Sequence, residues 1–149
     1  MASIQTENLP EGRETWEQFA NIKFEETKDV NNANIRVAFT RREGSWSYIG
    51  QNAKKYKGVT LNLGAIDTAL PPSPDDFGTI LHEFGHALGL VHELQSPLRT
   101  ADVTKKLRKN TGAYRRMYGQ DLVDDQMMNV LKGGSITNLS TFDRYSVMM

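Results

Sequence analysis

Apolar residues recur along the first part of the chain with two different periods, and each period predicts one kind of element. A spacing of three and four residues, seen at Trp16, Phe19 and Ala20, predicts a short amphipathic helix over about residues 11–21. Alternation of apolar and polar residues predicts strands at about 22–25, 35–40, 44–50 and 59–63. A basic stretch over 51–57 interrupts the alternation and is predicted to be a solvated loop. The first part of the chain is thus predicted to form a sheet with one helix.

A longer helix is predicted in the middle of the chain, because its start carries several independent signals. Ser73 can cap the first turn, Pro74 suits the first helical position, and Asp75 and Asp76 favour the positive end of the helix dipole. The predicted helix runs from about Pro74 to Leu88. Its apolar positions, and one just beyond its end, are expected in the core: Phe77, Ile80, Leu81, Phe84, Leu88 and Leu90.

The rest of the chain is predicted to be helical and irregular. Apolar stripes predict helices at about 100–109, 114–118 and 122–131, the last ended by Gly133-Gly134. The pattern as a whole predicts one α+β domain over residues 1–149. Residues 1–89 are expected to form an N-terminal subdomain with the sheet, and residues 90–149 a C-terminal subdomain.

Composition narrows the range of partners more than it narrows the fold. Lysine plus arginine equals aspartate plus glutamate, 18 of each, so neither nucleic acid nor an anionic membrane surface is an expected partner. No apolar run approaches the length of a membrane span, and residues 1–13 lack the apolar core of a signal peptide. The chain has no cysteine, which excludes a disulfide framework. We therefore expect a monomeric domain whose compartment the sequence leaves open.

All three histidines of the chain fall within residues 82–93, which read H-E-F-G-H-A-L-G-L-V-H-E. On a helix, His82 and His86 lie on the same face, so both imidazoles can reach one metal ion. Glu83 stands beside the first histidine and can reach a water on that ion without being a ligand. This spacing predicts a metal site on the face of the helix.

The third histidine, His92, requires the helix to end before it. Six residues beyond His86, a continuous helix would point a side chain about 240° away from the ligand face. Gly89 can take the left-handed conformation that ends a helix, so we expect it to have a positive φ and to let the chain swing back. Three neutral imidazoles and a water are the ligand set of a catalytic zinc site, which makes Zn²⁺ the predicted cofactor of His82, His86 and His92. A chance motif on an amphipathic helix is the alternative, and the glycine and third histidine disfavour it.

The motif H-E-x-x-H-x-x-G-x-x-H-E resembles that of the metzincin clan of zinc endopeptidases, and the glutamate after the third histidine, Glu93, resembles the astacin family among them. The stretch Ser146-Val147-Met148-Met149 looks like the S-x-M-x-Y methionine turn of astacins, with Met148 as the turn methionine. The resemblance runs from about Trp16 to the last residue. Because the chain lacks cysteine, it is most similar to the cysteine-poor astacin-like proteases of microbes.

This resemblance implies a metzincin-like fold, with a twisted mixed sheet, an active-site helix and a C-terminal part that ends in the methionine turn. It implies a zinc metalloendopeptidase in which Glu83 is the general base and Met148 forms an apolar floor below the histidines. A peptide or protein substrate would add to residues 44–50 as to an antiparallel edge strand, although core aromatics on an edge strand are the simpler reading of that stretch. The resemblance implies a buried polar network around Glu93 near the mature N-terminus, with a salt-bridged surface acid as the alternative. Family members are mostly secreted.

The chain departs from the family pattern at its ends. The turn stops at Met149, where the family tyrosine that can ligate zinc would be the next residue, and Tyr145 precedes the turn and cannot replace it. The family's first strand and its segment after the turn are not visible, so we expect a domain trimmed at both ends, with three protein ligands to zinc and weak activity. A non-catalytic remnant that binds zinc and peptides is an alternative, as is a structural protein with a chance motif. Glu83 argues for the enzyme, because a mere zinc binder needs no base there.

Overall fold

The computed structural model describes residues 10–132 and 139–149, and the chain forms two compact units, Met1–Leu90 and Val91–Met149. The expected subdomains, 1–89 and 90–149 of one peptidase domain, stay a prediction. The helix end expected at Gly133-Gly134 and most of the stretch said to lack a signal peptide lie outside the described residues.

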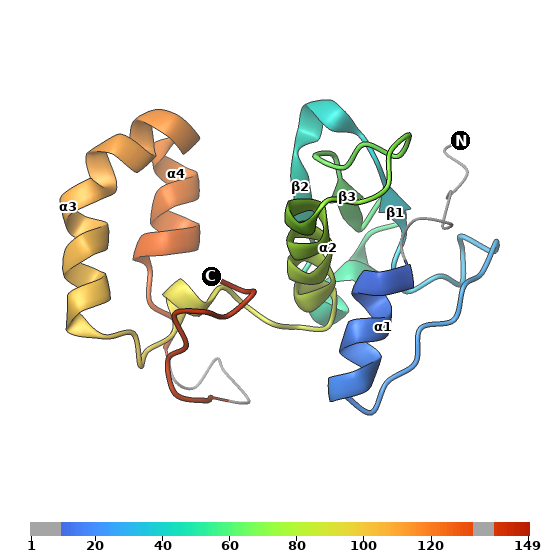
Figure 1. The fold of residues 1–149 in the computed structure, drawn as a ribbon, viewed down its shortest axis with the longest axis horizontal. Coiled ribbons are helices and arrows are strands. Elements are labelled where there is room, and N and C mark those ends of the chain that lie inside the picture. The colour runs from blue at the N-terminus through green and yellow to red at the C-terminus, as the bar shows by residue number, and fades with distance from the viewer. Residues whose placement is uncertain (1–9, 133–138) are drawn as a thin grey trace. The chain divides into compact units, whose positions relative to one another are not determined.

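The first unit is built on a three-stranded mixed sheet with the strand order β1-β3-β2 (Figure 1). Strand β3 (Leu61–Leu63) is central: β1 (Val37–Ala38) runs parallel to it, and β2 (Ser45–Ser47) runs antiparallel to it. Leu61, Asn62 and Leu63 are all fully buried, and since successive side chains point to opposite faces, the strand is covered on both faces. The mixed sheet with its helices confirms the predicted α+β class. Each observed strand is shorter than the stretch of alternating residues that predicted it.

The strand predicted at 22–25 is wrong, because no neighbouring strand pairs with it among the described residues. Its Phe24 N–H instead donates to the Glu17 carboxylate of helix α1 (Pro10–Phe19), with an N···O distance of 2.6 Å. The Phe24 ring packs edge-on against Phe84, with ring centroids 5.4 Å apart. Alternation therefore identified the inward side chain, whereas a strand also needs a ladder partner.

The loop predicted at 51–57 contains a 3₁₀ turn, Gly50–Lys55, which corrects the sequence prediction. Ala53 is buried within this turn, which a uniformly solvated loop would not allow. Arg36 supplies the reason, because its guanidinium group donates hydrogen bonds to four carbonyl oxygens, those of Ala33, Ala53, Tyr56 and Gly58. The planar group with its five donors can satisfy several carbonyls at once, so a distant side chain orders this stretch. A shorter 3₁₀ turn, Arg41–Glu43, joins β1 to β2.

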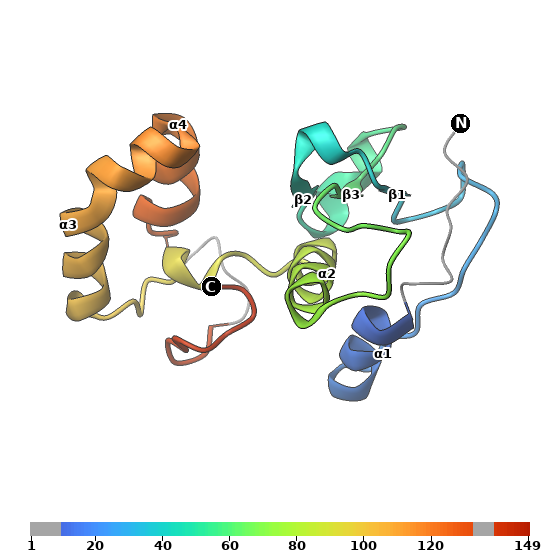
Figure 2. The same ribbon diagram turned by 45° about the horizontal axis from the view of Figure 1, so that its top comes forward.

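Helix α2 (Pro74–Ala87) begins and ends close to its predicted bounds. Ser73 and Asp76 form a capping box, in which each side chain accepts the backbone N–H of the other residue. The helix packs against both the sheet and α1 (Figure 2). The indole N–H of Trp16 donates to the carbonyl oxygen of Leu81, which fastens α1 to α2. The buried core of this unit consists of Leu61, Leu63, Ile66, Ile80 and Phe84.

The second unit is helical, as predicted, but its helices have different bounds. The separate helices predicted at 100–109 and 114–118 are one helix, α3 (Ala101–Tyr118), since nothing between them breaks the backbone pattern. The helix predicted at 122–131 begins and ends earlier, as α4 (Gln120–Val123) and a π-helical turn, Asp124–Met128. Weak helix breakers inside α3, Gly112 among them, cost about 1 kcal/mol, which a long helix tolerates.

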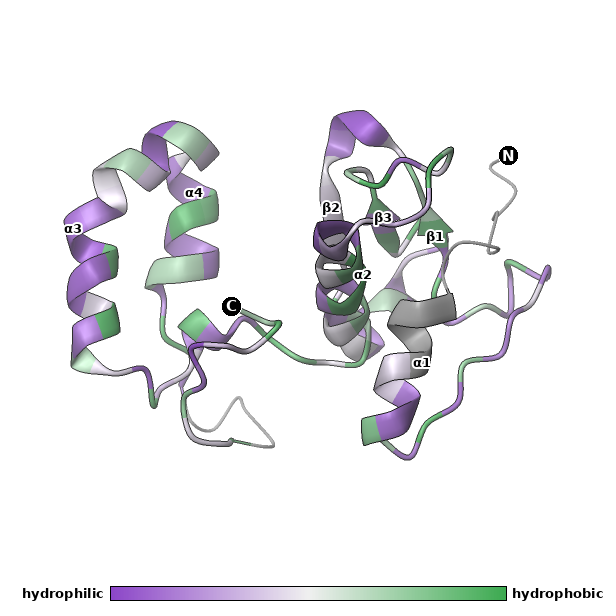
Figure 3. Ribbon diagram, in the orientation of Figure 1, coloured by the Kyte–Doolittle hydropathy of each residue, from purple (hydrophilic) through white to green (hydrophobic). Residues whose placement is uncertain are grey.

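The described part of the second unit buries few apolar side chains. Leu107, Val123 and Met148 are its buried hydrophobic residues among those described. Figure 3 shows that α3 is mostly hydrophilic, whereas β1 and β3 of the first unit are hydrophobic. Among the described residues, no helix combines the length and the apolar character needed to cross a membrane.

Candidate metal centre

Helix α2 carries the first two candidate ligands one turn apart. The rings of His82 and His86 stand edge to face, with centroids 4.7 Å apart and an interplanar angle of 88°. His86 is 6% exposed, and Phe84, on the opposite face of the same turn, belongs to the buried core. The capping box at Ser73 fixes where the helix starts, and the helical period then places both imidazoles on one face.

The helix ends in a Schellman motif centred on Gly89. The N–H of Gly89 donates to the His86 carbonyl oxygen and the N–H of Leu90 donates to the Gly85 carbonyl oxygen, both at 2.9 Å. Gly89 has a φ of +105°, which confirms the predicted helix break. The turn also packs closely on the sheet side, where a Cβ at Gly50 would lie 3.2 Å from the Gly89 Cα. Backbone geometry thus fixes the point at which the chain leaves the helix.

This turn also orients His86. The Nδ1 atom of His86 lies 2.8 Å from the carbonyl oxygen of Leu90. A carbonyl oxygen only accepts hydrogen bonds, so Nδ1 carries the proton and Nε2 keeps its lone pair for a metal. Burial lowers the pKa of His86 and outweighs the opposing effect of the Leu90 hydrogen bond, and the charge on His82 lowers it further, which favours the neutral ring that a metal requires. Leu90, expected in the core, is instead 40% exposed and acts through its backbone.

The three histidines form one cluster. One ring nitrogen from each of His82, His86 and His92 lies within 4.8 Å of the other two. Three imidazoles without a cysteine are a donor set typical of a catalytic zinc site, because structural zinc sites are usually closed by four ligands that include thiolates. The residues present therefore fit a zinc ion with at least one position left for water or substrate.

Glu83 lies beside the cluster and is almost fully buried, with 6% of its surface exposed. Its Oε2 atom is buried and has no hydrogen-bond partner among the described residues. Burial raises the pKa of Glu83 to about 7, because the charged carboxylate loses water there. A buried acceptor without a protein partner is costly unless a water or a proton satisfies it. Glu83 is therefore suited to take up a proton.

Glu93 is neither buried in a polar network nor paired with a cation among the described residues. One oxygen of its half-buried carboxylate accepts the N–H of Asp143 at 2.9 Å. Its own N–H donates to the carbonyl oxygen of Met148 at 2.8 Å, and the Met148 side chain is 4% exposed. Among the described residues Glu93 therefore holds the chain near the methionine turn, and the expected polar network near the N-terminus stays a prediction. The part of its expected network that involves the first nine residues lies outside the described ones.

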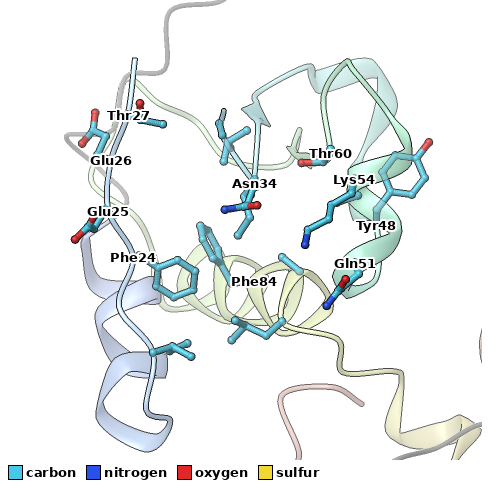
Figure 4. Close-up of a pocket in the computed structure, with 18 of the residues that line it drawn as sticks. Phe24, Glu25, Glu26, Thr27, Asn34, Tyr48, Gln51, Lys54, Thr60 and Phe84 are labelled. Atoms are coloured by element: carbon cyan, nitrogen blue, oxygen red, sulfur yellow. The ribbon is translucent and has the colours of Figure 1, made fainter. Parts of the chain in front are cut away.

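A cavity of about 870 Å³ lies on the other face of α2 (Figure 4). Figure 4 shows Phe24 and Phe84 facing one another at the cavity and the ammonium group of Lys54 pointing into it. Phe84 lies about 200° around the helix from His82, so this cavity is distinct from the histidine cluster. None of the three histidines lines it.

The family model of the astacin peptidases matches residues 1–148 of the chain. Blastula protease 10 of Paracentrotus lividus is 29% identical over 102 residues, which cover 66% of this chain and 16% of that protein. Zinc metalloproteinase nas-36 of Haemonchus contortus is 30% identical over 82 residues, or 55% of this chain and 12% of that protein. The chain thus spans less than a fifth of the length of these two relatives. The solved structure of myroilysin matches with a TM-score of 0.78 and 28% identity, over 99% of this chain and 72% of that one.

Proposed function

Since the chain belongs to the astacin family of peptidases, we propose that it is a zinc-dependent metalloendopeptidase. In this proposal His82, His86 and His92 bind the zinc ion and Glu83 is the general base. One observation supports it above the others: a ring nitrogen of each histidine lies within 4.8 Å of the other two. Metal ligands must converge on one point, and residues that share only a sequence motif need not do so.

The proposed chemistry asks two things of Glu83. When bound, zinc acts as a Lewis acid and lowers the pKa of a bound water to about 7. Glu83 would accept a proton from the water that attacks the scissile carbonyl carbon, and would deliver that proton to the leaving amine nitrogen as the peptide bond breaks. Its buried Oε2, which has no hydrogen-bond partner among the described residues, supports this role.

The remaining residues bind or orient. The Leu90 carbonyl oxygen holds the Nδ1 proton of His86, which leaves the Nε2 lone pair available to bind a metal. Strand β2 pairs with β3 on one side and has no second partner among the described residues, so its other edge can add a peptide as a further strand. We propose a peptide or protein substrate at this edge, bound by a monomer, with no nucleic-acid or membrane partner.

Metal content and cleavage together test the proposal against its alternatives. The purified chain is stripped with a chelator, reloaded with zinc, and assayed for bound metal and for casein cleavage. We expect one zinc per chain and cleavage that Glu83→Gln abolishes while zinc is retained. Zinc without cleavage would favour the non-catalytic zinc and peptide binder. A chain that binds no zinc would overturn the proposed metal site and favour a structural role for this member of the family.

A further inference from the structure

We propose that Gln95 is the positioning residue of His92: its side-chain amide holds the backbone of the third metal ligand in place. The inference rests on the proposed function, because it takes His92 to be a ligand. Nothing in the motif of residues 82–93 includes Gln95, which lies just beyond it.

Gln95 holds both polar backbone groups of His92. A 3₁₀ turn, Glu93–Gln95, follows the histidine, and the Gln95 N–H donates to the His92 carbonyl oxygen at 2.9 Å. The His92 N–H in turn donates to the Gln95 side-chain oxygen, Oε1, at 3.2 Å. A main chain bound on both sides by one residue has little freedom to rotate, so the direction of the Cα–Cβ bond of His92 is restrained as well.

Gln95 is itself held by distant parts of the second unit. Its side-chain nitrogen, Nε2, donates to the carbonyl oxygen of Asp125 at 2.8 Å, and its own carbonyl oxygen accepts the N–H of Leu131 at 2.9 Å. The residue is 8% exposed, so water does not readily replace these bonds. The position of His92 is therefore set by residues more than thirty positions further along the chain.

The amide is the one side-chain group of this length that satisfies both contacts at ordinary pH. An N–H can only donate and a carbonyl oxygen can only accept, so the two contacts require an acceptor and a donor at the end of one side chain. Glutamine provides both and has a single orientation that fits. An ionised glutamate keeps the acceptor for His92 but turns a second negative oxygen toward the Asp125 carbonyl oxygen. Gln95→Glu is thus a nearly isosteric test of the contact.

The experiment measures zinc affinity by competition with a chromophoric chelator, at about pH 8, where glutamate is normally ionised. It compares the wild-type chain, Gln95→Glu, His92→Ala and the double variant. Gln120→Glu is the matched control, since it makes the same chemical change at an exposed position of α4. The visible spectrum of the cobalt-loaded chain reports the ligand geometry, and circular dichroism of the metal-free chain reports folding.

Gln95→Glu should weaken zinc binding by about 10- to 100-fold and alter the cobalt spectrum, as loss of groups that orient metal ligands typically does. Gln120→Glu should match the wild type. In the His92→Ala background Gln95→Glu should change zinc affinity no further, because a residue that acts through His92 has nothing left to position. If Gln95→Glu does not fold, Gln95→Met, which keeps the length without a donor and with only a weak acceptor, takes its place in the same cycle.

Equal zinc affinity in the wild type and a folded Gln95→Glu would overturn the proposal and leave the zinc site intact. A further loss of affinity in the His92→Ala background would overturn it too, because it would mean a general structural role. A wild-type chain that binds no zinc would instead overturn the proposed function, and the positioning role with it.

Discussion

The two segments that carry the candidate ligands are held in opposite ways. Around His86 the hydrogen bonds described above are local: the Schellman bonds and the bond from Nδ1 to Leu90 join residues at most five positions apart. Around His92 the contacts are long-range, through Gln95 to Asp125 and Leu131. A short peptide sequence can thus specify the first two ligands, whereas the third depends on a folded second unit. The predictions below test this contrast.

The largest effects are expected when the ligands themselves are removed. His82→Ala, His86→Ala and His92→Ala should each weaken zinc binding by more than about 100-fold, because loss of groups that merely orient ligands already costs 10- to 100-fold. Each should also lose the rise in melting temperature that zinc gives the wild type, since a metal that binds only the folded state stabilises it. Calorimetry with and without zinc measures both effects.

The stability of the metal-free His86→Ala and His92→Ala variants tests whether the two ligand segments differ without zinc. His86 is buried and bonded to Leu90, whereas His92 is only half-buried, so His86→Ala should lower the metal-free melting temperature more than His92→Ala does. If His92→Ala proved the more damaging of the two, the ligand segments would not differ in the way described.

The next largest effect concerns catalysis on the helix side of the site. Glu83→Gln should lower kcat by about 10²- to 10⁴-fold, the usual contribution of a general acid–base group. Zinc affinity should stay within a few-fold of the wild type, because Glu83 is not a proposed ligand. Steady-state kinetics on one peptide and chelator competition provide the two values. A variant that cleaves as fast as the wild type would remove Glu83 from the mechanism.

A smaller effect is expected from alanine at the helix end, with the opposite sign from the same change within a helix. Gly89→Ala should destabilise the chain by about 1–2 kcal/mol, because its φ of +105° strains a residue with a Cβ, although open space surrounds that Cβ. Gly112→Ala, inside α3, should stabilise it by about 0.5–1 kcal/mol, because its Cβ would meet only an Arg116 side-chain nitrogen at 3.7 Å. Urea denaturation of the metal-free chain tests both. If both substitutions changed the free energy of unfolding in the same direction, the positive φ of Gly89 would not be what requires glycine there.

The smallest effect is a pH dependence of the metal-free chain. Burial raises the pKa of Glu83 from 4.5 to about 7, so the folded state holds an extra proton between these values and this part of the stability falls as pH rises. Burial lowers the pKa of His86 below 6.5, so its part rises with pH toward that value and partly cancels the first. The difference in melting temperature between wild type and Glu83→Gln should therefore shift in favour of the variant from pH 5 to pH 7. A constant difference would contradict the burial of Glu83.

The same contrast explains what the sequence could predict. Helix α2 and the break at Gly89 were predictable, because a cap, a helical period and a glycine are local signals. The stretch 22–25 was not, since alternation reports burial but not whether a partner strand exists. Gln95 was missed for a related reason: it is held by contacts with Asp125 and Leu131, which are distant in the sequence and which no residue spacing predicts.

Leu90 makes its contact with His86 through the backbone, so substitutions of its exposed side chain would not detect that contact. What His86 uses is the carbonyl oxygen, which every amino acid has, and proline alone is excluded because the Leu90 N–H also donates to Gly85. A side-chain scan would therefore report position 90 as permissive, and variation among homologues there would suggest that it has no role. Only chemistry on the backbone detects the contact: an ester in place of the peptide bond after Leu90 would weaken this acceptor while leaving all side chains unchanged.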